Sequence, residues 1–149
     1  MRQFGSPPRR SIAYTRRPGV YAVILRGGQM LTTFQNEPEP EFQLPGGGID
    51  PGEAPIPALH REVMEETGWT IAVRCRLGIY QTYRYMPDYD LWARKLCTLY
   101  LCSPGLRRGP PLEPGHSAHW MPADVAVRAI ASPGDRFYAA RALRSHRDG

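Results

Sequence analysis

The sequence has little cysteine, no long apolar run and no contiguous basic stripe, and each shortage excludes a class of protein. Its three cysteines (Cys75, Cys97 and Cys102) are too few and too scattered for a disulfide framework or a Cys-x-x-Cys metal site. No apolar run approaches the 18 or more residues of a membrane span, and the first residues lack the apolar region of a signal peptide. We expect a cytoplasmic protein with no membrane contact and no stable nucleic-acid partner.

Proline and glycine are abundant, with 16 and 15 residues respectively, or about a fifth of the chain. This content excludes a simple helical bundle and predicts long, specific loops. The length of 149 residues, of which 42% are apolar, indicates one domain with one core. We therefore expect a single domain over residues 1–149, in which the Pro- and Arg-rich residues 1–17 form a flexible N-terminal extension.

Charges of opposite sign are segregated along the chain, although the net charge is only +5. Eight of the 14 acidic residues lie between Glu37 and Glu66, where Arg61 is the single basic residue. The remainder of the chain carries 18 basic residues and six acidic ones. A locally acidic patch in a basic protein suits a metal cation that meets an anionic ligand.

The hydrophobic pattern predicts strands first, one helix in the middle of the chain, further strands and two terminal helices. The expected strands span residues 20–25, 30–34, 42–44, 71–73, 77–85 and 95–102, with a short strand end at 120–121, and the expected helices span 55–67, 124–131 and 133–145. This order indicates an α+β fold with a mixed sheet.

Three glutamates share one face of the expected helix over residues 55–67. At 100° per residue, Glu65 and Glu66 lie within about 60° of Glu62. Like charges at this spacing destabilise a helix, and the helix dipole disfavours anions in the last turn, where Glu65 and Glu66 fall. A solvated acidic face is one explanation. A divalent cation, Mg²⁺ or Mn²⁺, is the other, because such broken local rules are typical of functional sites.

A glycine triplet, Gly46 to Gly48, precedes this helix, so that a backbone carbonyl can approach the same cation. The triplet begins a longer pattern over the 23 residues from Gly47 to Trp69: Gly47, five residues, Glu53, seven residues, Arg61-Glu62-Val63, Met64, Glu65-Glu66, Thr67, Gly68 and Trp69. This pattern resembles the box of the Nudix hydrolase family, G-x5-E-x7-R-E-U-x-E-E-x-G-U, where U is a bulky aliphatic residue. Trp69 departs mildly from it because it is aromatic.

The resemblance covers most of the chain from Val20 to Ala131. It implies an α/β/α sandwich with a mixed sheet. It also implies hydrolysis of a nucleoside diphosphate linked to another moiety, with water attacking phosphorus in the presence of Mg²⁺ or Mn²⁺. The small size favours a small nucleotide over a large RNA, and a homodimer is left open.

The resemblance also implies roles for individual residues. Glu65 and Glu66 would bind the metal with help from the Gly47 or Gly46 carbonyl, and Glu62 would act as a ligand or as the base that activates water. Glu53 would support these ligands or bind another metal, and Arg61 would hold the glutamates by charge-assisted hydrogen bonds. Many relatives place a further acid in the loop before a tryptophan, and Glu113 is the acid available here as ligand or base.

Substrate contacts lie outside the box and are less specified by the sequence. Arg84 and Lys95 fall on expected strands near the cleft and are candidates for phosphate binding. Tyr83 and Tyr85 share a strand face that Tyr80 does not share, and an aromatic ring there can stack on a base or simply pack against the sheet.

Two other functions remain open on the same fold. A non-catalytic nucleotide sensor would generally lose the glutamates of the box, whereas this chain keeps Glu53, Glu62, Glu65 and Glu66. An isomerase of prenyl diphosphates would need a cysteine in the cleft. Cys97 and Cys102 are five residues apart on one expected strand and so face opposite ways, and only one of them qualifies.

Overall fold

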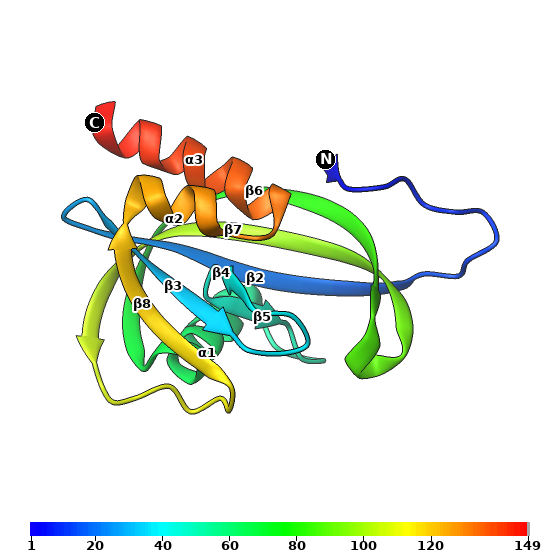
Figure 1. The fold of residues 1–149 in the computed structure, drawn as a ribbon, viewed down its shortest axis with the longest axis horizontal. Coiled ribbons are helices and arrows are strands. Elements are labelled where there is room, and N and C mark those ends of the chain that lie inside the picture. The colour runs from blue at the N-terminus through cyan, green and yellow to red at the C-terminus, as the bar shows by residue number, and fades with distance from the viewer. Residues whose placement is uncertain (149) are drawn as a thin grey trace.

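The computed structural model describes residues 1–148, which form a mixed sheet with helices on both faces (Figure 1). The strands are β1 (Arg2–Phe4), β2 (Thr15–Arg26), β3 (Gln29–Gln35), β4 (Glu41–Gln43), β5 (Gly46–Gly48), β6 (Trp69–Met86), β7 (Leu91–Arg107) and β8 (His116–Pro122). The helices are α1 (Pro55–Thr67), α2 (Ala123–Ala129) and α3 (Pro133–Asp148), and a short 3-10 turn, η1 (Pro87–Tyr89), joins β6 to β7. No helix among these residues is long and apolar enough to cross a lipid bilayer.

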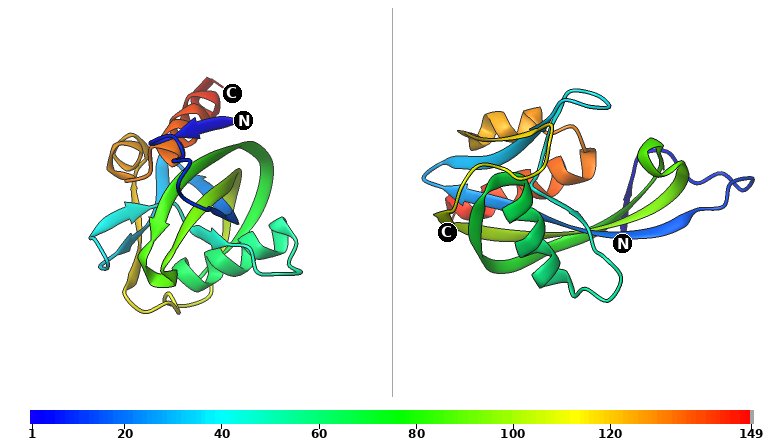
Figure 2. Two further views of the ribbon diagram at one scale, coloured as in Figure 1. Left: turned by 90° about the vertical axis from the view of Figure 1, so that its right-hand side faces the viewer. Right: turned by 90° about the horizontal axis from the view of Figure 1, so that it is seen from below.

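The strand order is β1-β6-β7-β2-β3-β4, with β5 paired to β2 and β8 paired to β3. β2 runs parallel to β7 and antiparallel to β3, and β6 runs antiparallel to β7, so the sheet is mixed as expected. β6, β7 and the start of β2 extend well beyond the helices as a long ribbon (Figure 2).

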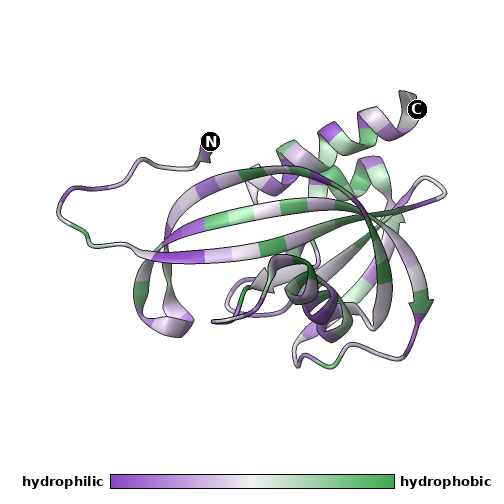
Figure 3. Ribbon diagram, turned by 180° about the vertical axis from the view of Figure 1, so that it is seen from behind, coloured by the Kyte–Doolittle hydropathy of each residue, from purple (hydrophilic) through white to green (hydrophobic). Residues whose placement is uncertain are grey.

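β2 separates the two halves of the core, because alternate residues of a strand face opposite sides of the sheet. Val20, Ala22 and Ile24 pack against α1, whereas Val23 and Leu25 pack against α2 and α3. Figure 3 shows hydrophobic and hydrophilic bands along the long strands. Burial of both sheet faces under helices confirms the α/β/α sandwich of the α+β class.

Helix α1 has the bounds that the sequence predicted. Pro55 and Pro57 lie in its first turn, where a missing N–H costs no hydrogen bond. Gly68 ends the helix in the left-handed conformation, with φ of 76°, and its N–H donates to the Met64 carbonyl at 2.9 Å. Helix α3 likewise begins at Pro133, as expected.

The structure differs from the sequence-based expectation in three places. The short strand end expected over residues 120–121 belongs to the seven-residue strand β8. The strands expected over residues 71–73 and 77–85 are one strand, β6, in which irregular pairing with β7 absorbs the interruptions. The sequence also favoured a flexible extension over residues 1–17, but both ends of this segment join the sheet. β1 pairs parallel with β6 opposite Tyr80 to Thr82, and β2 begins at Thr15.

Candidate active site

The glycine triplet forms β5 and lies directly against the acidic face of α1. The Gly46 N–H donates to Glu66 Oε1 at 2.9 Å, which joins the strand to the last turn of the helix. A Cβ atom on Gly47 would lie 2.6 Å from the Glu62 carboxylate carbon, closer than real Cβ contacts come. Glycine at 47 therefore allows the backbone and the Glu62 carboxylate to meet.

Arg61 connects three of the box glutamates. Its Nε and Nη2 atoms donate to the two oxygens of Glu53 at 2.7 and 2.8 Å, a bidentate pair. Its Nη1 atom donates to Glu62 at 3.1 Å and to Glu65 at 3.3 Å. The hydrogen bonds from Arg61 to Glu53 lower the pKa of Glu53 to about 2. This contact pattern is the one that the family resemblance implies for Arg61.

Glu113 comes from the loop before β8 and reaches the same face of α1. Carboxylate oxygens of Glu62, Glu65 and Glu113 all lie within 4.8 Å of one another. The loop is fixed there because the backbone N–H groups of Leu112 and Glu113 donate to the Glu65 carbonyl at 2.8 and 3.1 Å. These bonds satisfy a carbonyl in the last turn of α1, which has no partner within the helix. The folded chain thus brings the loop acid to the box.

Glu66 is the most enclosed of these glutamates, with 9% of its side chain exposed. Burial raises the pKa of Glu66 to about 8, against the opposing effect of the Gly46 N–H. Burial also raises the pKa of Glu62. The second carboxylate oxygen of Glu66, Oε2, lies 3.9 Å from His116 Nε2. Carboxylates gathered in such a poorly solvated place fit a hard divalent cation, which would compensate their charge.

A cleft of about 640 Å³ is lined by residues of both charge signs. Gly47, Glu53 and Glu62 contribute to its lining, and so do Arg17 and Lys95. Arg17 pairs with Lys95 across β2 and β7, so both side chains point to the same face of the sheet. We call this space the acidic cleft. Its lining suits a cation near the glutamates and a phosphate group near the basic side chains.

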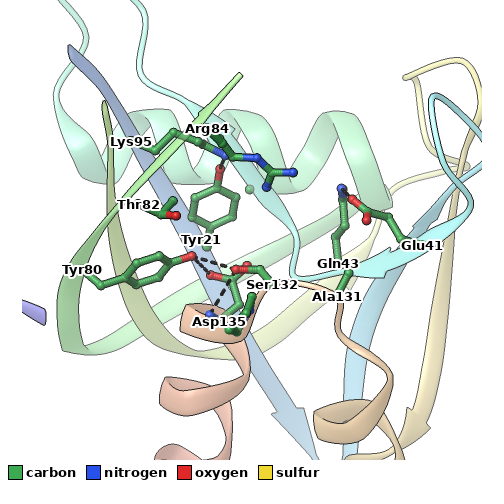
Figure 4. A pocket seen from close by; sticks show the side chains of 12 residues that line it. Tyr21, Glu41, Gln43, Tyr80, Thr82, Arg84, Lys95, Ala131, Ser132 and Asp135 are labelled. Carbon is green, nitrogen blue, oxygen red and sulfur yellow. Dashed lines mark hydrogen bonds between the residues drawn. The ribbon is translucent and has the colours of Figure 1, made fainter. Parts of the chain in front are cut away.

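A second hollow of about 320 Å³ adjoins the acidic cleft, since Tyr21 and Lys95 line both (Figure 4). It lies beneath the first turn of α3, and we call it the α3 hollow. Its lining is mostly polar and comes from five parts of the chain, namely Tyr21, Glu41, Gln43, Gly46, Tyr80, Thr82, Arg84, Lys95, Ala131, Ser132, Pro133 and Asp135. Two walls carry opposite chemistry, with Asp135 on α3 and the cations Arg84 and Lys95 on β6 and β7.

The four substrate-side candidates from the sequence separate in space. Arg84 and Lys95 line the α3 hollow together. Tyr83 contacts Tyr14, with 4.8 Å between the ring centroids, and lines none of the described hollows. Tyr85 packs against Trp92 and lines a shallower hollow of about 400 Å³ beside Arg84.

Sequence reasoning missed Tyr80, Ser132 and Asp135 as site residues. Tyr80, Thr82 and Arg84 alternate along β6, so strand alternation from Arg84, a candidate near the cleft, would have placed Tyr80 on the same face. The position of Asp135 opposite Tyr80 had no such signal, because 55 residues separate the two.

Cys97 and Cys102 lie in opposite halves of the core, as the spacing predicted. Both are buried, and burial raises the pKa of each thiol. Neither lines the acidic cleft or the α3 hollow. The cysteine needed for the isomerase alternative is therefore not in the cleft.

The sandwich, the box on α1 and the acidic cleft define a NUDIX fold, and comparison with known proteins agrees. The family model described as the NUDIX domain matches residues 15–141, and the chain belongs to this family. Solved structures with the same fold include a NUDIX hydrolase from Nitrosomonas europaea (TM-score 0.72, 14% identity, 92% of this chain and 76% of that one) and the MutT protein from Methanosarcina mazei Go1 (TM-score 0.68, 22% identity, 91% and 99%).

Curated relatives match over shorter segments. A putative 8-oxo-dGTP diphosphatase from Bacillus subtilis is 32% identical over 74 residues, which are 50% of this chain and 50% of that protein. An RNA pyrophosphohydrolase from Helicobacter pylori (strain 26695) is 40% identical over 57 residues, which are 35% of this chain and 37% of that protein. The chain thus spans half of the first relative and little more than a third of the second.

Proposed function

We propose that the protein hydrolyses a pyrophosphate bond in a small nucleotide, a nucleoside diphosphate linked to another group, with Mg²⁺ or Mn²⁺ as cofactor. The observation that carries this proposal is the meeting of Glu62, Glu65 and Glu113 within 4.8 Å beside the acidic cleft. Phosphoryl transfer depends on positioning and on charge neutralisation, and the glutamates and basic side chains that line the cleft offer both. The relatives named as a putative diphosphatase and as a pyrophosphohydrolase belong by name to the same reaction class.

The arrangement of the side chains supports the following roles. Glu62, Glu65 and Glu66 would hold the cation together with the backbone at Gly47, and Glu113 would act as a further ligand or as the base. Glu53 keeps Arg61 in place between these glutamates. The bound cation supplies charge neutralisation and a more acidic water. The base that accepts the proton of the attacking water comes from Glu62, Glu65 or Glu113. Arg17 and Lys95, which also line the cleft, bind the diphosphate.

The α3 hollow receives the group attached to the diphosphate. A volume of about 320 Å³ next to the cleft accommodates one nucleoside rather than a nucleic-acid strand. Arg84 and Lys95 line the hollow (Figure 4), and Lys95 also lines the acidic cleft. All three cysteines are free thiols, which is compatible with a reducing cytoplasm.

A nucleotide panel with Mg²⁺ or Mn²⁺ tests the proposal. The panel contains nucleoside triphosphates, nucleotide sugars, ADP-ribose and dinucleoside polyphosphates, and the products are quantified by chromatography. We expect turnover of at least one compound by the wild-type protein and by Glu37→Gln, a change to an exposed acid outside the cluster. Glu65→Gln should lose at least about a hundredfold in rate.

Absence of turnover with every compound would contradict hydrolysis. Binding of a nucleotide without turnover would instead support the sensor alternative. Calorimetric titration with Mg²⁺ and Mn²⁺ tests the metal site independently of turnover. Glu65→Gln should weaken metal binding whether or not a substrate has been found.

A further inference from the structure

Strand β1 supports the α3 hollow from behind. It pairs with β6 at the residues whose side chains line the hollow, with Arg2 opposite Tyr80 and Phe4 opposite Thr82. The Phe4 ring meets the Tyr80 ring edge to face, with centroids 5.3 Å apart, and it also contacts Phe137 on α3 at 5.7 Å. Phe4 therefore packs the N-terminal strand against both β6 and α3 behind the hollow, without lining the hollow itself.

Tyr80 is held tightly by its surroundings. Only 2% of it is exposed. On the side of α3, a Cβ atom on Gly134 would lie 2.4 Å from the Tyr80 ring, so the first turn of the helix approaches as closely as a glycine allows. Tyr138 stacks against the same ring at 6.2 Å. With Phe4 at the edge, Tyr80 has one available position.

The Tyr80 hydroxyl in turn holds Asp135. It donates to Asp135 Oδ1 at 2.6 Å and lies 3.0 Å from Ser132 Oγ (Figure 4). Asp135 is 5% exposed, and no hydrogen bond within residues 1–148 engages its second oxygen, Oδ2. Oδ2 is not fully buried, so it can accept a hydrogen bond from a ligand or water. The α3 hollow is the space available to such a partner.

We propose that Phe4 is a positioning residue, which acts through Tyr80 to hold Asp135 where its free oxygen accepts a hydrogen bond from an N–H or O–H group of the substrate. The inference rests on the proposed function, because it concerns the group attached to the diphosphate. Asp135 touches that group, Tyr80 fixes the rotation of the carboxylate, and Phe4 fixes Tyr80. The N-terminal strand is thus part of the specificity machinery, 76 residues ahead of the tyrosine that it supports.

The first test compares Phe4→Ala with Phe4→Leu and with Arg2→Gln. Leucine keeps most of the apolar contact with Tyr80, and the Arg2 guanidinium, on the same strand, lies over the ring of Phe137. We expect Phe4→Ala to raise KM about five- to tenfold with kcat within about twofold, the size of one weakened hydrogen bond. Phe4→Leu and Arg2→Gln should stay near the wild type. A fall in kcat with unchanged KM would overturn the proposal.

A double-mutant cycle distinguishes this relay from a general loss of packing. Asp135→Asn should raise KM by a similar factor, and Phe4→Ala should add little in the Asp135→Asn background, because both changes act on one contact. Multiplied effects would overturn the proposal. Thermal unfolding of each variant verifies that the protein is folded at the assay temperature.

Equilibrium binding of the nucleotide panel separates failure of this inference from failure of the proposed function. Binding is measured with the wild-type protein and with Phe4→Ala, and also in the Glu65→Gln background, where turnover is slow. If the wild-type protein binds a nucleotide without hydrolysing it, and Phe4→Ala weakens that binding, the relay stands and hydrolysis is excluded. If the wild-type protein hydrolyses a substrate and Phe4→Ala binds it with unchanged affinity, hydrolysis stands and the relay is excluded. Absence of binding and turnover overturns both.

Discussion

The guanidinium of Arg61 meets the carboxylate of Glu53 in a bidentate pair, with N–O distances of 2.7 and 2.8 Å. The same guanidinium reaches Glu62 and Glu65, so that one side chain sets the spacing of the acidic face. A loss of such supporting contacts typically reduces metal affinity or activity by about 10- to 100-fold. We therefore propose that Arg61 holds the glutamates in place rather than touching the substrate.

Arg61→Lys should therefore lose most of this support although it keeps the charge. A lysine ammonium cannot make the bidentate pair with Glu53 and bind Glu62 at the same time. We expect at least about a tenfold lower metal affinity by calorimetry and a parallel fall in kcat. Arg128→Gln, a change to an exposed arginine on α2, is the control. An Arg61→Lys protein with wild-type metal affinity would contradict the assigned role.

Adjacent glycines of β5 offer a matched pair of variants. A Cβ atom on Gly47 would collide with the Glu62 carboxylate, whereas a Cβ atom on Gly48 would meet nothing within 4 Å. Gly47→Ala should displace Glu62 and reduce kcat by at least about tenfold. Gly48→Ala should leave activity near the wild type. Equal kinetics for the two variants would show that contact between β5 and Glu62 has no part in catalysis.

Asp135 predicts a specific dependence of stability on pH. Burial raises its pKa from the ordinary 3.8 to about 6, against the opposing effects of the Tyr80 hydrogen bond and the charges of Lys95 and Arg84. The folded protein therefore binds more protons than the unfolded chain between about pH 4 and pH 6, and stability contributed by this group falls as pH rises through that window. The full change is on the order of 2–3 kcal/mol.

Denaturant unfolding of the wild type and of Asp135→Asn measures this effect as a difference. Asparagine cannot ionise, so the stability of Asp135→Asn relative to the wild type should increase from about pH 4 to about pH 6 and then level off. Other titrating groups act equally in both proteins and cancel. A difference that does not vary over this window would show that Asp135 titrates normally.

Glu113 is the member of the carboxylate cluster that does not lie on α1, so it can be changed without altering the helix. Glu113→Gln keeps the two backbone N–H bonds that anchor its loop to the Glu65 carbonyl, so the fold should be unchanged. We expect weaker metal binding and a kcat at least about tenfold lower, because one anionic oxygen leaves the group formed with Glu62 and Glu65. Glu39→Gln, in an exposed loop, should behave as the wild type. Unchanged metal affinity in Glu113→Gln would exclude Glu113 as a ligand.

The sequence predicted the structural features that depend only on residues close together in the chain. The bounds of α1 follow from two prolines at its start and a glycine at its end, and the shared face of Glu62, Glu65 and Glu66 follows from helical geometry. The opposite directions of Cys97 and Cys102 follow from strand alternation. Each of these features needs only a few neighbouring residues, so the sequence contains the information.

Contacts between distant segments were not predictable in the same way. Pairing of β1 with β6 depends on aromatic partners of Phe4 that lie 76 and 133 residues away, and no local pattern in residues 1–17 indicates them. The continuity of β6 depends on its pairing with β7, which accommodates irregular positions that read as strand ends in the sequence alone. The α3 hollow exists only once five separate segments meet.

The proposed function depends on the attack of water on phosphorus of a pyrophosphate bond in the acidic cleft. Phosphorus-31 NMR of the turned-over nucleotide in ¹⁸O-enriched water measures this attack directly. We expect one ¹⁸O atom on one of the two phosphate products with the wild-type protein, and no labelled product above background with Glu65→Gln. Products that carry no ¹⁸O on phosphorus, or equal labelling by Glu65→Gln, would contradict it.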